Sequence, residues 1–364
     1  MSTQIASPDR AARQQKRRRL RNNELRLDFA IGFILLAVFI LLPVLSPGKY
    51  VLGQITLFFI WGGTVVNWNL IFGVAGIYSL AQMAVFLVGG YTVALMGFYW
   101  DISIWASALI GALFAGIFSV IVGAATLRLK GPYVLLLTLA IAVVVQKLVQ
   151  SDVECFFYQD KLCYPLTGGA RGLMRFGNFG FRDWLGFKQA PLGTYYLGLV
   201  LIVVSTVFAF AIIKSPFGSA FRALRDNQPL AASRGIGRVK YQILVFGLSG
   251  FFTGLMGVLY AGHFRVIGTN MLDFELLFFL FTMLAVGGLG SRWGPLIGGI
   301  AIMLANEVMK EFGEWRMVAF GGITVLFMVA FRQGLVGMAN DLWLKWGKPR
   351  TGKNTAQANR SEAD

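Results

Sequence analysis

The chain has 364 residues, of which 56% are hydrophobic and 14% are charged, and its formal net charge is +16. An average soluble domain is about 45–50% apolar and about 25% charged, so a soluble two-domain protein would lack the charged surface that it needs. Disordered and collagen-like chains are also excluded, because Phe alone contributes 32 residues.

Apolar runs that approach the length of a bilayer span, about 20 residues, occur ten times along the chain. We therefore predict an all-α polytopic membrane protein with about ten transmembrane helices, within a range of 8–10. The predicted spans are 28–45, 52–72, 74–97, 103–126, 132–150, 192–213, 241–262, 276–290, 294–310 and 317–331.

Charge predicts the orientation of these spans, because Lys and Arg accumulate in cytoplasmic segments. Four segments together carry the whole net charge of +16, and they are residues 1–27, 127–131, 214–240 and 332–364. Ten spans that start inside place all four on one side, so both termini are predicted in the cytoplasm and loop 151–191 outside. Two halves of five spans would be inverted repeats.

The same topology divides the chain into three parts. A basic cytoplasmic tail, 1–27, precedes a transmembrane domain, 28–338, and a second cytoplasmic tail, 339–364, is expected to be disordered. The basic run at 16–19 lacks interleaved aromatic residues and adjoins a span. We therefore expect it to attract anionic lipid and predict no nucleic-acid partner.

Catalytic and metal-binding signatures are missing from the sequence. The two cysteines and one histidine exclude Cys-rich zinc modules and sites with several His ligands, so no metal site is predicted. Gly347, followed after four residues by Gly352-Lys353-Asn354, nearly matches an ATP-binding loop, but such a loop needs Ser or Thr after the Lys. We predict that the chain is not an enzyme and holds no cofactor.

Cys155 and Cys163 lie in the long polar loop 151–191. In an oxidising compartment they would form a disulfide that closes a short ring, and otherwise they would be two free thiols. The sequence leaves both interpretations open.

Two late spans, 276–290 and 294–310, are short and meet at a glycine-rich junction. Broken helices of this kind occur beside the substrate path of transporters, but a tight turn between closely packed helices gives the same pattern. Polar and small residues inside spans raise a similar choice between lining a path and bonding helices together. The candidates for the path are Asn69, Gly73, Ser79, Gln82 and Thr138.

Loop 214–240 is the most informative polar segment. Ser215 suits a helix N-cap and Pro216 the first helical position, and a second short helix, 230–234, is expected to stop at Gly235. An apolar stripe at helical spacing consists of Phe217, Ala220, Phe221 and Leu224. On its own this helix has nothing to bury the stripe against, so it would lie on the membrane or dock into another protein.

Five blocks of sequence, in order, extend this picture: 69–80, 131–140, 167–173, 215–236 and 287–298. The fourth block contains Ser215-Pro216-Phe217-Gly218, and the fifth contains Gly287-Gly288-Leu289-Gly290-Ser291. Together they resemble the permeases of branched-chain amino acid ABC transporters, the LivM type, over about residues 30–338. The fourth block is similar to the loop through which those permeases couple to their ATPases.

The resemblance implies a bacterial inner-membrane permease subunit of an ABC importer for branched-chain or related amino acids. It implies four kinds of contact: a homologous second permease, two ABC ATPase subunits that bind the ATP, a periplasmic substrate-binding protein, and the lipid bilayer. Relatives that carry urea, amides or other small polar solutes share the pattern, and a stand-alone channel or secondary carrier is the rival class.

The resemblance also assigns roles within loop 214–240. Phe217, Phe221 and Leu224 would fill a groove on the ATPase, and Arg222 and Arg225 would meet acidic groups of the partner. The full set implied for coupling is Ser215, Pro216, Phe217, Gly218, Phe221, Arg222, Leu224, Arg225, Asp226, Ala231, Ala232 and Gly235.

Overall fold

The computed structural model describes residues 28, 30–45, 48–159, 162–313, 315–330 and 334–338, and within these it leaves out some side chains, including those of 157–164. The predicted tails 1–27 and 339–364 therefore lie outside the described residues. Two compact units are present, Met1–Gln54 and Ile55–Asp364. The first contains the apolar helix Ala30–Leu45 and the start of the helix Lys49–Asn69, and the second contains the rest of that helix and the other elements discussed below.

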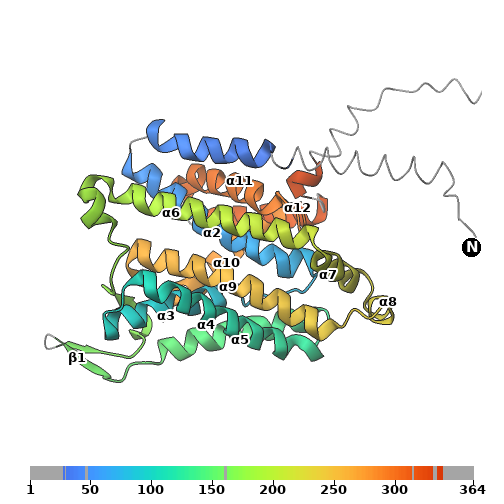
Figure 1. The fold of residues 1–364 in the computed structure, drawn as a ribbon, viewed down its shortest axis with the longest axis horizontal. Helices are drawn as coiled ribbons and strands as arrows, with labels where there is room; N and C mark the ends of the chain where they lie inside the picture. The colour runs from blue at the N-terminus through green and yellow to red at the C-terminus, as the bar shows by residue number, and fades with distance from the viewer. Residues whose placement is uncertain are drawn as a thin grey trace, which may run out of the picture. The chain divides into compact units, whose positions relative to one another are not determined.

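Helices dominate the second unit (Figure 1). The long helices are α2 (Lys49–Asn69), α3 (Gln82–Trp100), α4 (Ile104–Ala125), α5 (Pro132–Gln150), α6 (Phe181–Lys214) and α9 (Arg238–Phe264). The shorter ones are α7 (Pro216–Asp226), α8 (Gln228–Ser233), α10 (Phe274–Gly287), α11 (Gly294–Val308) and α12 (Trp315–Ala330). A π-helical segment, η1 (Leu70–Val74), continues α2, and 3₁₀ turns form η2 (Thr126–Arg128), η3 (Gly169–Arg171), η4 (Thr269–Leu272) and η5 (Met309–Phe312).

Within the described residues, six helices are long and apolar enough to cross a membrane. They are Lys49–Val74, Gln82–Trp100, Ile104–Arg128, Pro132–Gln150, Gln189–Lys214 and Arg238–Phe264, and three shorter apolar helices are Ala30–Leu45, Phe274–Gly287 and Val318–Ala330. The protein is thus a polytopic membrane protein. The predicted spans fall on these helices and on α11, whereas the total of ten, the orientation and the inverted repeats stay predictions.

One predicted span begins too early. The sequence places a span at 74–97, but the chain leaves the helix after η1 and α3 begins only at Gln82. Gly76 lies between them with a φ of +69°, a left-handed conformation that glycine adopts readily and a helix cannot continue through. Ile77 and Leu80, which lie in this link, are as apolar as the residues of a spanning helix, so hydropathy alone does not reveal the break.

The centre of the second unit is a close packing of α3, α4 and α9. Glycine makes it possible, because a Cβ on Gly257 of α9 would overlap the carbonyl oxygen of Phe86 in α3. Small residues let membrane helices approach in this way. Around the contact, the rings of Trp61, Phe86 and Tyr260 pack in tilted and edge-to-face pairs with centroids 5.4–5.7 Å apart.

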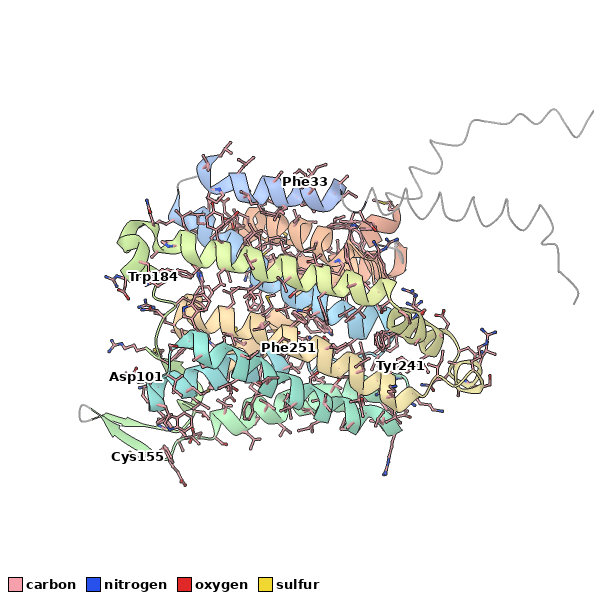
Figure 2. The ribbon with its side chains drawn as sticks, in the orientation of Figure 1. Phe33, Asp101, Cys155, Trp184, Tyr241 and Phe251 are labelled. Carbon is pink, nitrogen blue, oxygen red and sulfur yellow. The ribbon has the colours of Figure 1, made fainter. Side chains whose placement is uncertain are left out.

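Short strands close one end of the helical bundle. β1 (Phe157–Gln159) pairs antiparallel with β2 (Leu162–Tyr164), and β3 (Leu173–Met174) pairs with β4 (Val266–Ile267). α7 and α8 lie at the opposite end (Figure 1). Figure 2 shows the same division, with Tyr241 near α7 and with Cys155 and Trp184 at the strand end.

Candidate functional site

Helices α7 and α8 form as the sequence predicts. The Ser215 hydroxyl accepts a hydrogen bond from the Phe217 amide at 3.2 Å, and Pro216 occupies the first turn of α7. Asn227 ends α7 and caps α8, where its side chain accepts from the Leu230 amide at 3.1 Å. Gly235, with a φ of +80°, follows the end of α8. The predicted second helix, 230–234, is confirmed, but it begins two residues earlier and spans Gln228–Ser233.

The apolar stripe of α7 is divided between two environments. Phe221 is 1% exposed and contacts Tyr241 of α9 edge to face, with ring centroids 6.1 Å apart. Phe217, one turn earlier, is 44% exposed. The expectation that the stripe has nothing of its own to bury against is therefore wrong for Phe221 and for Ala220, which is also buried. Both pack within this chain, so Phe221 cannot fill a groove on a partner.

Gly218 brings α7 close to the end of α6. A Cβ at this position would lie 2.5 Å from the carbonyl oxygens of Ile212 and Ile213, which is too close for any side chain. Arg222 adds a bond to the same turn, because its Nη1 donates to the Ile213 carbonyl oxygen at 3.2 Å. These contacts hold α7 against α6.

Arg225 connects α7 to the end of α2. Its Nη1 donates to the carbonyl oxygen of Gly73 in η1 at 2.9 Å, and its Nε lies 3.0 Å from the carboxylate of Asp226. Gly76 makes room for the connection, since a Cβ there would overlap the Arg225 side chain. Part of the guanidinium that was expected to meet a partner is thus used within the chain.

Asn69 connects η1 to the junction between α10 and α11. Its Oδ1 accepts from the Gly290 amide at 2.9 Å, and its Nδ2 donates to the Ser291 carbonyl oxygen at 2.9 Å. Gly73 lies beside this pair, and a Cβ on it would overlap both Asn69 Oδ1 and Gly290 N. The two bonds tie the predicted path residues Asn69 and Gly73 to the late glycine-rich junction.

The other predicted path residues are buried and hydrogen-bonded across helices. The Thr138 hydroxyl accepts from the Leu80 amide at 3.0 Å, and the Ser79 carbonyl oxygen accepts from Trp68 Nε1 at 2.8 Å. Gln82 Nε2 donates to the Ser249 hydroxyl at 3.1 Å and to the Thr253 hydroxyl. In this structure they bond helices together, and their role in a path stays a prediction.

The structure reveals a polar group that sequence reasoning passed over. Asn67 is fully buried, and neither its Nδ2 nor its Oδ1 has a hydrogen-bond partner among the described residues. A buried amide without partners is costly, so its presence calls for an explanation. The signal in the sequence was the pair Asn67 and Asn69 within one apolar span.

The remaining coupling residues differ in how exposed they are. Asp226 has a side chain that is 66% exposed, whereas Ala231 is 3% exposed. Pro216, Ala232 and Gly235 are exposed, and Ser215 and Leu224 are partly buried. At the strand end, Cys155 is disulfide-bonded, and the side chain of Cys163 is outside the described set.

Comparison with known proteins places the chain in a family. A family described as "Branched-chain amino acid transport system / permease component" matches residues 50–331. The chain belongs to this family. No solved structure matches it.

Three relatives show the range of the family. The high-affinity branched-chain amino acid transport permease LivM of Escherichia coli is 26% identical over 324 residues, which cover 83% of this chain and 73% of LivM. The guanosine ABC transporter permease NupQ of Bacillus subtilis is 24% identical over 274 residues, or 72% of this chain and 75% of NupQ. The ribose import permease RbsC of the same species is 26% identical over 156 residues, or 40% and 48% of the two chains.

Membership in the family fixes the class of the protein. It is a multi-pass permease subunit of an ABC importer, homologous to the bacterial inner-membrane protein LivM, and it is a non-catalytic transport component. Separate ATPase subunits handle the ATP, and importers of this class also use a binding protein.

Proposed function

We propose that this permease imports branched-chain or related amino acids and receives the work of ATP hydrolysis through α7 and α8. The similarity to LivM supports this solute, because it covers 83% of the chain, whereas the similarity to the ribose permease covers 40%. A nucleoside or another small polar solute is the second candidate, because the guanosine permease matches over 72%.

The observation that carries the coupling role is a continuous series of contacts. It starts at α7, runs through Arg225 to the Gly73 carbonyl oxygen, and continues through Asn69 to Gly290 and Ser291. A displacement of α7 therefore pulls on the end of α2 and on the junction between α10 and α11 at once. Both are interruptions of regular helix, where the backbone can shift with the loss of few helical bonds.

The exposed face of α7 is the surface that we assign to the ATPase. Phe217 and Asp226 are exposed there, whereas Phe221, one turn after Phe217 on the same face, is buried against Tyr241. The complex would comprise two ATPase subunits, a homologous second permease and a periplasmic binding protein. Charge supports a cytoplasmic location, because segments 127–131 and 214–240 at this end of the bundle are rich in Lys and Arg, as cytoplasmic segments are.

Asn67 is our added candidate for the solute path. Its side-chain amide has no partner among the described residues, and its backbone carbonyl oxygen accepts from the Ser249 hydroxyl at 2.7 Å. An amide that has both a donor and an acceptor to offer suits a zwitterionic or polar solute.

Replacement of Arg225 tests the coupling role. In vesicles that contain the whole importer, with leucine on the binding protein, we expect Arg225→Gln to lower uptake per ATP hydrolysed by about tenfold. A hydrogen bond from a charged donor contributes about 1.5–3 kcal/mol, which is the order of that loss. The measurement is the ratio of leucine uptake to phosphate release.

Arg234→Gln is the matched control, because Arg234 is exposed at the end of α8 and loses the same charge. An equal loss in both variants would mean that charge, and not the bond to Gly73, matters. Guanosine in place of leucine discriminates the solutes, since stimulation of ATP hydrolysis by guanosine alone would replace the amino-acid assignment while leaving the coupling test intact.

Cysteine labelling tests the orientation. Ser233 on α8 and Val153 at the strand end are both exposed, and Cys155 is disulfide-bonded and so does not react with maleimides. In intact spheroplasts we expect an impermeant maleimide to label Val153→Cys and to spare Ser233→Cys. The reverse pattern would contradict a cytoplasmic α7.

A further inference from the structure

A cavity of about 260 Å³ lies at the α7 end of the bundle. Its lining comes from the link after η1, the link between α4 and α5, the first turn of α5, helices α7 and α8, and the start of α9. Ile77, Val134 and Val245 supply apolar wall, whereas Tyr78, Tyr241 and Gln228 supply polar groups. It is smaller than the roughly 300–1,000 Å³ of typical small-molecule sites, so it suits one compact polar group and not a nucleotide.

The charged residues that line the cavity are all cations, namely Lys130, Arg225 and Arg238. Arg238 is held in place, because its Nη2 donates to the Leu129 carbonyl oxygen at 2.9 Å and its Nε to Gln242 at 3.1 Å. The nearest carboxylate, Asp226, bonds to Arg225 and is mostly exposed. Three positive charges with one peripheral carboxylate leave the cavity strongly cationic.

Two helices add to the positive potential. α5 begins at Pro132 after Gly131, which lines the cavity, and α9 begins at Arg238 after Gly237. Neither start has a side-chain cap, and the N-terminus of a helix carries a partial positive charge that attracts anions. The cations and the helix starts therefore favour the same ligand charge.

One wall of the cavity continues into an exposed, apolar face of α5. Only 17% of the span Pro132–Gln150 is buried, and near its start Tyr133 is 68% exposed and Leu136 is 60% exposed. An exposed aromatic ring at the end of a span marks the membrane interface. A ligand with a phosphate head and an apolar tail would place the head in the cavity and the tail along α5.

We propose that this cavity binds the phosphate headgroup of an anionic phospholipid from the inner leaflet. Basic pockets between membrane helices on the cytoplasmic side bind such headgroups in general. The bound phosphate would join Lys130 of the α4–α5 link, Arg225 of α7 and Arg238 of α9, and so would fix the position of the coupling helix. The leaflet rests on the proposed orientation, whereas lipid binding by the purified chain does not depend on it or on the solute.

Lipid titration with native mass spectrometry tests the site. The probe is phosphatidylglycerol added to the delipidated full-length chain, with phosphatidylcholine as the neutral lipid. One Lys or Arg near a membrane surface contributes roughly fivefold in affinity, so we expect Lys130→Gln to weaken the binding of the first phosphatidylglycerol by about fivefold. Lys130 is exposed, so its loss leaves the core unchanged.

Lys240→Gln is the matched control, because Lys240 is exposed on α9 and does not line the cavity. Equal weakening in both variants, or equal binding of phosphatidylcholine and phosphatidylglycerol, would overturn the site. A further arm adds inorganic phosphate as a competitor. Displacement of the lipid only at a large excess of phosphate supports the lipid, whereas free phosphate that binds as well as the lipid would overturn the lipid assignment and retain the anion site.

Discussion

The two ends of the helical bundle are held together in different ways. At the strand end, backbone ladders pair β3 with β4, and the Asp152 carboxylate accepts from both the amide and the hydroxyl of Thr167. At the α7 end, single arginine side chains reach backbone oxygens of other elements, as Arg225 does at Gly73 and Arg238 at Leu129. The strand end therefore combines backbone pairing with side-chain bonds, whereas the contacts named at the α7 end are individual side-chain bonds.

This difference indicates which end of the bundle can change its contacts during transport. A ladder is broken only when several backbone bonds open together, whereas a side-chain bond can be exchanged alone at a cost of about 1.5–3 kcal/mol when the donor is charged. We infer that the α7 end can change its contacts during transport while the strand end keeps its own. Replacements at each end test this contrast.

The largest effect on stability is expected from replacing the buried Phe221 of α7, compared with the partly exposed Phe217. Phe221→Ala should lower the free energy of unfolding by about 3–5 kcal/mol, because it empties a fully buried site, where Phe221 contacts Tyr241. Phe217→Ala removes a partly exposed ring whose centroid lies 6.3 Å from that of Tyr241, so it should lower stability by less than Phe221→Ala and should weaken binding of the ATPase. Thermal unfolding of the purified permease and co-purification of the ATPase measure the two quantities.

Comparing Phe217→Ala with Phe221→Ala separates packing of α7 within the permease from binding of α7 to the ATPase. If Phe217→Ala destabilised the permease as much as Phe221→Ala, the exposed face of α7 would be a packing surface. If neither replacement changed binding of the ATPase, α7 would not be its docking helix.

A smaller effect is expected at the junction of η1 with the α10–α11 link. Gly73→Ala would force a Cβ against Gly290 N and Asn69 Oδ1, and such overpacking costs about 1–3 kcal/mol. Uptake should fall with it, because both interrupted segments are displaced. The measurements are thermal unfolding and leucine uptake by the assembled importer.

Gly321→Ala in α12 is the control, since nothing lies within 4 Å of a Cβ at that position. There the exchange should stabilise the helix by about 0.5–1 kcal/mol, because alanine has the higher helix propensity. A Gly73→Ala permease as stable and active as Gly321→Ala would show that the junction is loosely packed.

The sequence predicts the elements of this protein better than their contacts. Long apolar runs locate the spans, and Ser215, Pro216 and Gly235 predict the starts and ends of α7 and α8, because caps and hydropathy are local properties of the chain. The short helices α10 and α11 are likewise predicted from the runs that meet at the late glycines. These features need no knowledge of what lies next to them.

The failures within the candidate site depend on neighbours that are remote in the sequence. Nothing in the segment around Phe221 reveals that Tyr241 packs beneath it, and nothing near Arg225 reveals that the Gly73 carbonyl oxygen is within reach. The burial of Asn67 without a partner is likewise a property of the packed helices. Residues of the candidate site could be named from the sequence, but the division between anchoring and exposed groups could not.

The smallest expected effect lies at the strand end, on the ion pair between Arg316 Nη2 and Glu275 Oε1, which are 2.8 Å apart. The pair joins the first turns of α12 and α10, but both side chains are at least about one-third exposed. A double-mutant cycle with Arg316→Gln and Glu275→Gln should give a coupling energy of only about 0.2–1 kcal/mol, because water and salt screen exposed pairs. The energy should decrease as salt is added, and uptake per ATP should stay at the wild-type value. A coupling energy above that of the Arg225 bond, or a loss of uptake in Arg316→Gln, would mean that this end also changes its contacts during transport, and the contrast between the two ends would fail.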